Sequence, residues 1–342
     1  MKRGERKRVW VWGWVWSTVG LLATGCCQPP ERRVSLETLV AAHNANADAV
    51  PKVWARAKIA VTMQDPASGL PFTWGSVSPL VTPNGLLVMV KGANRLGVQD
   101  FVLIGQEANI DLFRLGASTE ENKYYFWLRA GGKGRAWWGR LDLAGAPGIS
   151  AIPIDPTQLL AALNVCALPA AATDLPAAGL VMTTEHLSYL YDSPGEQTFA
   201  PCKHAYVVTS IERQPISRRI GFTRETYFLW SDTKPRRPFL IRYLDETGSP
   251  VMTARLGEYE PVPGATGSDL PVMPTDIRLD WPARHTSVHI VLSKMTTDKG
   301  VREACRFQDF LPEGLAVEQV DKALDPGQNR PNNPATNQGD DR

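Results

Sequence analysis

The sequence predicts a mainly β protein of the α+β class, built on one large curved antiparallel sheet, or incomplete β-barrel, with a few helices packed on the concave face. Short segments with the alternation of strands follow one another at near-regular spacing, and turns rich in Gly, Pro, Asn and Asp separate them. Only two segments have helical spacing, so most neighbouring strands are joined directly and should pair antiparallel. Two separate β sandwiches that divide near residue 150 are the structural alternative.

The N-terminus has the organisation of a secretion signal that ends at a lipidation site. A basic stretch over residues 2–8 precedes an apolar stretch over residues 9–22, and Ala-Thr-Gly-Cys follows. This run resembles a bacterial lipobox, in which the cysteine carries the lipid, so Cys26 is the predicted acylation site. Ala23 departs from the preferred Leu, and Cys27 fits less well because Cys26 would then occupy a small-residue position. A plain secreted protein or an uncleaved anchor is the alternative.

Four regions follow from this organisation. Residues 1–25 are the predicted lipoprotein signal peptide, 26–34 the lipidated cysteine and a short tether, 35–320 the folded domain, and 321–342 a disordered tail of Asn, Pro, Gln and Asp. The chain of 342 residues is 43% hydrophobic, which is enough for a real core.

The net charge gives little reason to expect a nucleic-acid partner. The formal charge of the whole chain is +2, but residues 1–25 contain five basic residues and one acidic residue. Their removal leaves 32 basic and 34 acidic side chains. A nearly neutral protein lacks the basic surface that nucleic acid requires.

Two helices are predicted. The first is capped by Ser35 and runs through residue 50, with Pro51 at its end. The second is capped by Asp155, with Pro156 at its first position and leucines at helical spacing behind it.

The remaining pattern is that of strands. In residues 52–64 every second side chain from Val53 to Met63 is apolar, while Trp54 and Arg56 lie on the other face. Residues 131–134 predict a loop before Trp137 and Trp138. Further strands are predicted over residues 72–81, 86–91, 98–105, 110–115, 124–129, 180–191, 205–213, 219–230, 239–245, 251–259, 277–281, 287–295 and 304–311.

Several of these pieces together resemble the LolA/LolB group of envelope lipoprotein carriers. The first helix with residues 53–61 resembles the opening of that group, residues 85–112 resemble its strand–loop–strand unit, and residues 274–279 with the segments after them resemble its closing strands. The resemblance covers most of residues 36–318, and the segment over residues 131–179 is longer than the group's pattern.

The resemblance implies a half-barrel whose helices close its mouth, and a cavity that takes up acyl chains without chemistry. Leu96 stands where LolB-like proteins present an apolar side chain to membrane or lipid; a Leu folded into the sheet edge is the alternative. Trp137 and Trp138 are further candidates for membrane contact, with core packing as the alternative. The candidate cavity-lining residues are Trp54, Phe72, Trp74, Phe101 and Phe126; ordinary core packing is their alternative as well.

Motifs for catalysis, metal or cofactor binding were sought and none was found, so no catalytic residue, metal ligand or cofactor is predicted. His285 and His289 are expected to face solvent. The basic cluster around Arg224 is expected on a solvated sheet face, with contact to anionic lipid head groups as the alternative; it comprises Arg213, Arg218, Arg219, Arg224, Lys234, Arg236 and Arg237. A disulfide between Cys166 and Cys202, with Cys305 buried as a small apolar residue, is one expectation, and three buried, reduced thiols are the alternative.

The sequence therefore predicts a non-enzymatic lipoprotein of the cell envelope, anchored in the outer membrane and facing the periplasm. Its expected partners are membrane lipid or lipoprotein acyl chains. A structural or assembly lipoprotein that holds a protein partner is the first alternative. A hydrolase with a dispersed site is the second.

Overall fold

The computed structural model describes residues 33–64, 69–91, 100–130, 133–144, 152, 154, 156–168, 181–187, 190–193, 196–198, 203–213, 220–229, 237–263, 271–299 and 301–322. The strands are β1 (Lys52–Gln64), β2 (Pro71–Gly75), β3 (Gly85–Val90), β4 (Asp100–Glu107), β5 (Ile110–Ser118), β6 (Lys123–Ala130), β7 (Lys133–Arg140), β8 (Val181–Leu187), β9 (Leu190–Ser193), β10 (Glu196–Thr198), β11 (Lys203–Arg213), β12 (Ile220–Leu229), β13 (Pro238–Leu244), β14 (Pro250–Pro261), β15 (Val272–Trp281), β16 (Thr286–Thr296) and β17 (Ala316–Gln319). The helices are α2 (Leu36–Asp48), α3 (Pro156–Ala162) and the 3-10 turns η1 (Leu141–Leu143), η2 (Pro282–Arg284), η3 (Arg302–Cys305) and η4 (Gln308–Phe310).

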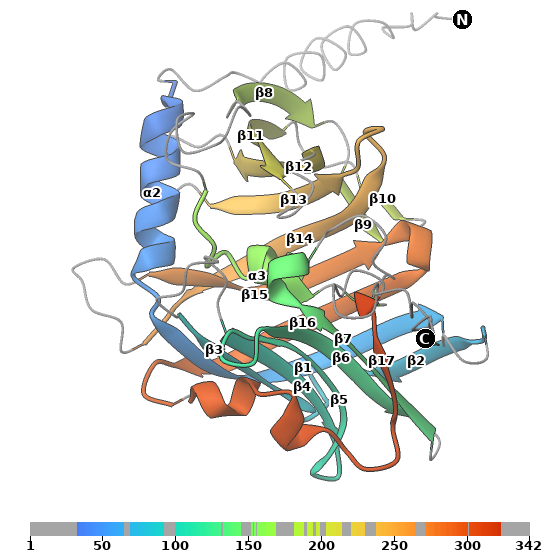
Figure 1. The fold of residues 1–342 in the computed structure, drawn as a ribbon. Helices are drawn as coiled ribbons and strands as arrows, with labels where there is room; N and C mark the ends of the chain where they lie inside the picture. Colours follow the sequence, from blue (N-terminus) through green and yellow to red (C-terminus); the bar gives the residue numbers. More distant parts are fainter. Residues whose placement is uncertain are drawn as a thin grey trace, which may run out of the picture.

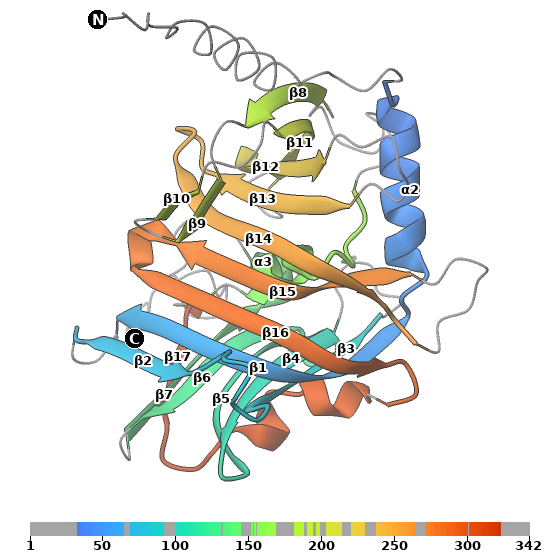
Figure 2. The same ribbon diagram turned by 180° about the vertical axis from the view of Figure 1, so that it is seen from behind.

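One curved, open sheet of 15 strands dominates the fold (Figures 1 and 2). The first strand, β1, pairs with β16 near the middle, and two arms extend from this central pair. The lower arm in Figure 1 runs from β3 to β7 and ends at β17, while the upper arm runs from β15 back to β8. Every pair is antiparallel except β17 with β7. The predicted large curved sheet is confirmed, and the two-sandwich alternative is wrong, because strands from both sides of residue 150 share one sheet.

Strand β1 shows how the sequence specifies one face of this sheet. Its burial alternates along the whole strand, as the sequence predicted. The first part of β1 pairs with β3 and the last part with β2, which leaves the backbone of Ile59 between the two partners. The side chain of Asn84 fills this gap: its Oδ1 accepts from Ile59 N at 2.8 Å and its Nδ2 donates to Ile59 O at 3.0 Å. A side-chain amide thus completes the ladder where the backbone cannot.

Helix α2 lies against the upper arm at one edge of the molecule (Figure 1). Ser35 caps it as predicted, since its Oγ accepts from Thr38 N at 3.2 Å. Two asparagines then fasten the helix to distant segments. Asn44 exchanges two hydrogen bonds with the backbone of Leu168, and Asn46 exchanges two with the backbone of Val272. Polar clamps of this kind fix the helix position independently of its apolar contacts.

The segment after β16 crosses the outer face of the lower arm, which is the face opposite to α3. Cys305 packs there on Val88 and Val102, and Phe307 packs on Tyr125 and Trp127. The strand predicted over residues 304–311 is wrong: this stretch forms η3 and η4. Its backbone bonds are local, such as Ala304 N to Val301 O, because its alternate apolar residues insert into the outer face of an existing sheet.

Two strands of the lower arm were not predicted. Residues 133–140 form β7 along β6, although the glycine-rich run before them suggested a loop. Residues 316–319 form β17, the only parallel partner in the described sheet. Asp321, predicted to begin the disordered tail, is buried and accepts a hydrogen bond from Arg140 N at 2.6 Å. The folded part therefore extends at least to Asp321; residues 323–342 lie outside the described residues.

Candidate functional site

The concave face of the sheet is a continuous apolar surface. Every second side chain of β1 points to this face. Side chains of directly paired residues on neighbouring strands point to the same side, so the apolar surface continues over both arms. Its largest buried side chains include Phe101 and Phe126 from the lower arm and Trp281 from the upper arm. Other members are Val53, Ala55, Ile59, Met63, Leu103, Leu115, Ile241, Met252, Leu279, Val288 and Ile290.

The short helix α3 sits in the curve between the two arms and contacts β5, β6, β14 and β15 (Figure 1). Leu159, Leu160 and Leu163 are buried in the concave face. Pro156 opens the helix as predicted, and Asn164 follows it in the left-handed conformation with φ of 59°, where Asn is one of the few tolerated side chains. The leucines of α3 therefore cover the apolar face. The sequence predicted that they lie on a helix but not where this helix packs.

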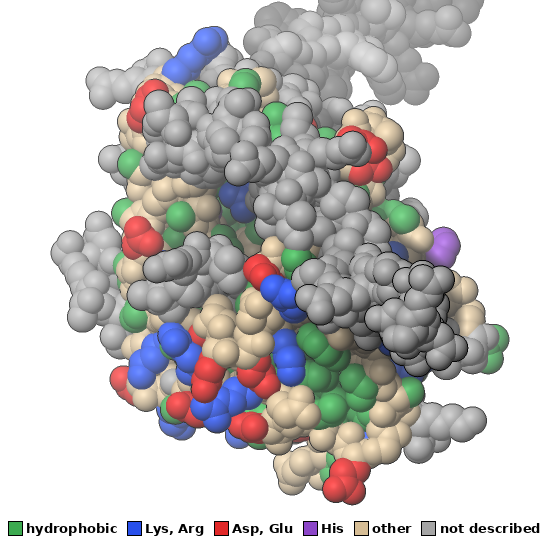
Figure 3. Space-filling view, viewed as in Figure 1, with side chains coloured by type: hydrophobic (Ala, Val, Ile, Leu, Met, Phe, Trp, Pro, Cys, Tyr) green, Lys and Arg blue, Asp and Glu red, His purple; other side chains and the backbone are tan. Residues whose placement is uncertain are grey.

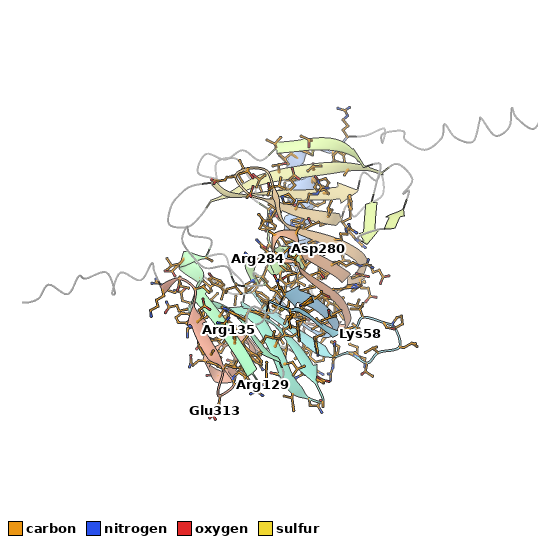
Figure 4. All side chains as sticks on the ribbon, turned by 90° about the vertical axis from the view of Figure 1, so that its right-hand side faces the viewer. Lys58, Arg129, Arg135, Asp280, Arg284 and Glu313 are labelled. Atoms are coloured by element: carbon orange, nitrogen blue, oxygen red, sulfur yellow. The ribbon has the colours of Figure 1, made fainter. Side chains whose placement is uncertain are left out.

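Two polar contacts hold α3 in place. Trp281 Nε1 donates to Gln158 Oε1 at 2.6 Å inside the core. Just before the helix, Arg284 donates from Nη1 to the carbonyl oxygen of Ile152; Figure 4 labels this arginine near the middle of the sheet. The N-terminal side of α3 is thus held by groups of the β15–η2 region, while the leucines of the helix make the apolar contact.

The candidate cavity-lining residues separate into two groups. Phe101 and Phe126 are fully buried in the concave face, and Phe72 and Trp74 are half-buried against it, with Trp74 edge-on to Phe113 at 5.3 Å between ring centroids. Trp54 is on the opposite face of β1, beside Ala304 and the η3 segment. Its assignment to the cavity is therefore corrected: successive residues of a strand face opposite sides.

Trp137 and Trp138 point to opposite faces of the sheet, because they are successive residues of strand β7. Trp137 is 5% exposed and stacks on Phe126 in the concave face, at 5.7 Å with the rings nearly parallel. Trp138 points to the outer face, where it packs with Leu311 and Leu315. In this structure Trp137 is a core residue that cannot reach a membrane, which corrects its assignment to membrane contact. Cys26 and Leu96 lie outside the described residues.

Sequence analysis missed a polar group beneath α2. His43, Ser210 and Arg224 are each at most 8% exposed and lie on the concave side of the upper arm, where α2 packs on β11 and β12. Burial, followed by the nearby charge of Arg224, lowers the pKa of His43 to about 4, against the opposing effect of the Cys166 carbonyl that Nε2 contacts at 3.0 Å. In the sequence, His43 stands at helical spacing with Leu36, Leu39 and Val40. This spacing places His43 on the apolar side of the helix but carries no information about Ser210 and Arg224.

Two groups of titratable side chains on the outer side of the sheet have structural roles: the pair of His289 with Asp276, and the buried thiol of Cys305. His289 Nε2 lies 2.8 Å from Asp276 Oδ1, and this hydrogen bond is the main reason why the pKa of Asp276 is lowered. His289 was expected to face solvent; it is 24% exposed at its side chain and paired. Cys305 is buried, which raises the pKa of its thiol to about 12 and leaves it unreactive. No disulfide is described for Cys166 or Cys305, and Cys202 lies outside the described residues.

The described ranges contain neither a candidate metal site nor a candidate membrane-spanning helix. No group of three or more His, Cys, Asp or Glu side chains in them is arranged to hold a metal ion. No helix in that part of the chain combines the length and the apolar character needed to cross a membrane.

The fold and its concave face define a class of protein: an open, curved sheet whose apolar inner side is covered by α3 in the described part of the chain. No protein-family profile matches the chain, and no curated protein matches it by sequence. The structure is similar to a DUF1329 family protein from Desulfovibrio piger, with a TM-score of 0.46 and 11% identity over 81% of this chain and 97% of that one.

Two further solved structures are similar at lower scores. An outer membrane lipoprotein-sorting protein domain from Vibrio parahaemolyticus gives a TM-score of 0.37 and 9% identity, over 81% of this chain and 94% of that one. A LolA superfamily protein from Nitrosomonas europaea gives 0.34 and 12%, over 80% of this chain and 99% of that one. At these identities the similarity is one of fold.

Proposed function

We propose that this protein is a non-catalytic lipoprotein of the cell envelope, anchored through Cys26, that binds acyl chains on the concave face of its sheet. The observation that carries the proposal is the continuous apolar face from β13 to β7, over which the described residues place helix α3 and the short segments beside it. A second sheet covering this face would have to move as one body, because its strands are joined to one another by backbone hydrogen bonds. A short helix such as α3 can move by breaking few polar contacts.

An exchange of α3 for lipid would trade one apolar contact for another. Each methylene transferred from water is worth about 0.8 kcal/mol, so ten methylenes supply roughly 8 kcal/mol before the costs of ordering. The polar contacts that hold α3 are Trp281 to Gln158 and Arg284 to Ile152, and net hydrogen-bond contributions are each about 1 kcal/mol. The leucines of α3 would lose burial as the chain enters, so the lipid replaces one apolar surface with another.

The rim of the concave face supplies an entry point. Phe72, Trp74, Val251 and Tyr259 pack against the buried cluster but are themselves only partly buried. Apolar side chains in contact with both core and solvent are suited to receive the end of an acyl chain. An anchor at Cys26 would hold the domain close to the outer membrane on its periplasmic side, with Leu96 as the proposed contact to lipid.

The test is to purify the whole chain from a membrane-containing host, extract it with organic solvent, and analyse the extract by mass spectrometry. We expect stoichiometric acyl lipid. Leu115→Glu places a charge on the concave face of the sheet, where the acyl chain would lie, and should abolish the lipid. Leu80→Glu changes a side chain that is 96% exposed and should not. A folded wild-type protein without lipid in its extract, and without affinity for added palmitate, would refute the proposal.

A second candidate function, a scaffold for a protein partner, has one observation in its favour. Apolar side chains remain exposed in the segment after β16, residues 301–322: Phe310 is 38% exposed and Val317 is 49% exposed. Figure 3 shows an apolar area on the side that carries η3, η4 and β17, beside acidic and basic side chains. A photo-crosslinking residue at position 317 tests this function: one defined protein adduct in cells, together with a lipid-free interior, would favour the scaffold.

A further inference from the structure

The concave face contains one polar island beneath α2. Ser210 of β11 and Arg224 of β12 are cross-strand partners, so their side chains point to the same side. That side is the one on which Tyr206, Val208 and Phe228 pack against α2. The exposed fractions of Ser210 and Arg224 are 1% and 6%.

His43 is on the side of α2 that faces β11 and β12, where it contacts Phe228. Its ring lies edge-on to Phe228, with 5.8 Å between the centroids, and the charge of Arg224 acts on it. The Nε2 atom is 3.0 Å from the carbonyl oxygen of Cys166, which can only accept, so Nε2 carries the proton of the neutral ring. Nδ1 therefore presents a lone pair to the island.

Two atoms of the island lack hydrogen-bond partners within the described part of the chain: His43 Nδ1 and Ser210 Oγ. Buried polar atoms are rarely left unpaired in a native protein, and where they are, a ligand or an ordered water is the usual explanation. Arg224 adds a positive charge to the same place. The other buried cation of the described residues, Arg114, lies on the outer face with Phe310 and Ala304. The island therefore offers a cation, a hydroxyl and an imidazole at one end of an apolar surface.

We propose that the island formed by His43, Ser210 and Arg224 binds the anionic head group of a single-chain lipid, a carboxylate or a phosphate monoester, whose chain lies along the concave face. This inference rests on the proposed function and adds the location of the head group. The guanidinium of Arg224 and the hydroxyl of Ser210 donate to the anionic oxygens. His43 Nδ1 accepts a hydrogen bond from the P–OH group that a phosphate monoester keeps in its monoanionic form; a carboxylate has no such proton and is bound by Arg224 and Ser210.

The position of the island fits a lipid bound in one direction. Tyr243 of β13 is the cross-strand partner of Arg224 and belongs to the concave apolar cluster, as does Met252 beyond it. A chain that starts at Arg224 therefore enters the apolar face directly, without a polar gap. Leu39, Val40 and Leu168 cover the head-group end and exclude water from it.

The experiment compares three probes of the same chain length on the whole protein: palmitate, 1-palmitoyl lysophosphatidate and hexadecanol, which has no anionic group. Binding is measured by titration calorimetry for wild type, Arg224→Met and Ser210→Ala. Arg242→Met is the matched control, because Arg242 lies on the outer face and donates to Tyr227 Oη at 3.0 Å.

We expect Arg224→Met to weaken at least one anionic probe about tenfold or more and to leave hexadecanol unchanged, with Arg242→Met affecting neither. The tighter of the two anionic probes identifies the head group. In wild type, the anionic probe should shift the 15N signal of His43 Nδ1, and hexadecanol should not. This measurement and Ser210→Ala keep the test valid if Arg224→Met does not fold.

Equal binding of all three probes, with no effect of Arg224→Met and no change at His43, would overturn the inference, and an ordered water would then be the partner of the island. That outcome leaves acyl binding intact. Failure of all three probes to bind the folded wild type would instead refute the proposed function itself, so the two failures are distinguishable.

Discussion

Acidification should unfold this protein through His43. The ordinary pKa of 6.5 applies to the unfolded chain, whereas burial beneath α2 lowers the pKa to about 4 in the folded protein. Between pH 6.5 and 4 the unfolded chain therefore binds the proton and the folded chain does not. The free energy of unfolding falls as the pH falls through this window. A difference of about 2.5 pH units corresponds to about 3 kcal/mol at 1.4 kcal/mol per unit, a large share of a typical total.

The assay is urea unfolding of the whole chain, followed by tryptophan fluorescence at pH 7, 5.5 and 4. Carboxylates also titrate in acid, so the contribution of His43 is the difference from a matched variant. His43→Gln keeps a nitrogen near the position of Nε2 for the Cys166 carbonyl but has no proton to gain. We expect the variant to lose about 3 kcal/mol less than wild type between pH 7 and 4. Parallel losses in the two proteins would refute the reasoning.

Three further expectations concern the outer segment and the sheet. Asp100→Ala removes a buried carboxylate that binds the segment after β16 and should cost about 2–3 kcal/mol in urea unfolding, whereas Asp309→Ala, at an exposed ion pair, should cost less than about 1 kcal/mol; equal losses would contradict the assignment. Gly116→Ala brings a Cβ to 2.5 Å from the Phe101 carbonyl and should cost about 1–3 kcal/mol, while Gly257→Ala meets nothing closer than 3.9 Å and should stay within about 0.5 kcal/mol. The thiol of Cys305, whose pKa is raised to about 12 by burial, should stay unmodified by a thiol reagent in native protein and react once urea unfolds it; rapid native labelling would exclude the burial described above.

Much of the fold could be predicted because alternation and turn chemistry are local. Strand β1 runs over residues 52–64, as its pattern predicted, and Ser35 and Pro156 mark the helix starts. Strand β7 was missed because its pairing with β6 outweighs the glycines before it. Residues 304–311 were misassigned because their alternate apolar side chains serve a different purpose: they fill the outer face of an existing sheet.

The site was harder to predict than the fold. Phe101 and Phe126 could be placed in the interior from strand pattern alone. Trp54 could have been excluded, because it stands opposite the apolar residues of its own strand. The island of His43, Ser210 and Arg224 has no local pattern, since its residues come from a helix and two strands that the fold brings together late. Burial of one arginine from a basic stretch cannot be recognised without the topology.

The pairing of β1 with β16 also determines when the molecule can be completed. Apart from β17, which pairs with β7 across about 180 positions, the arms consist mainly of strands paired with near neighbours in sequence, and these pairs can form as soon as their residues are available. The seam between the arms joins Thr62 to Ser287, about 225 positions later. Closing so long a loop is entropically costly, so the seam should be the late, rate-limiting step of folding. Until then the lower arm exposes the free edge of β1, and the apolar face that later holds α3 stands open to water and to any chaperone that recognises unfolded chains.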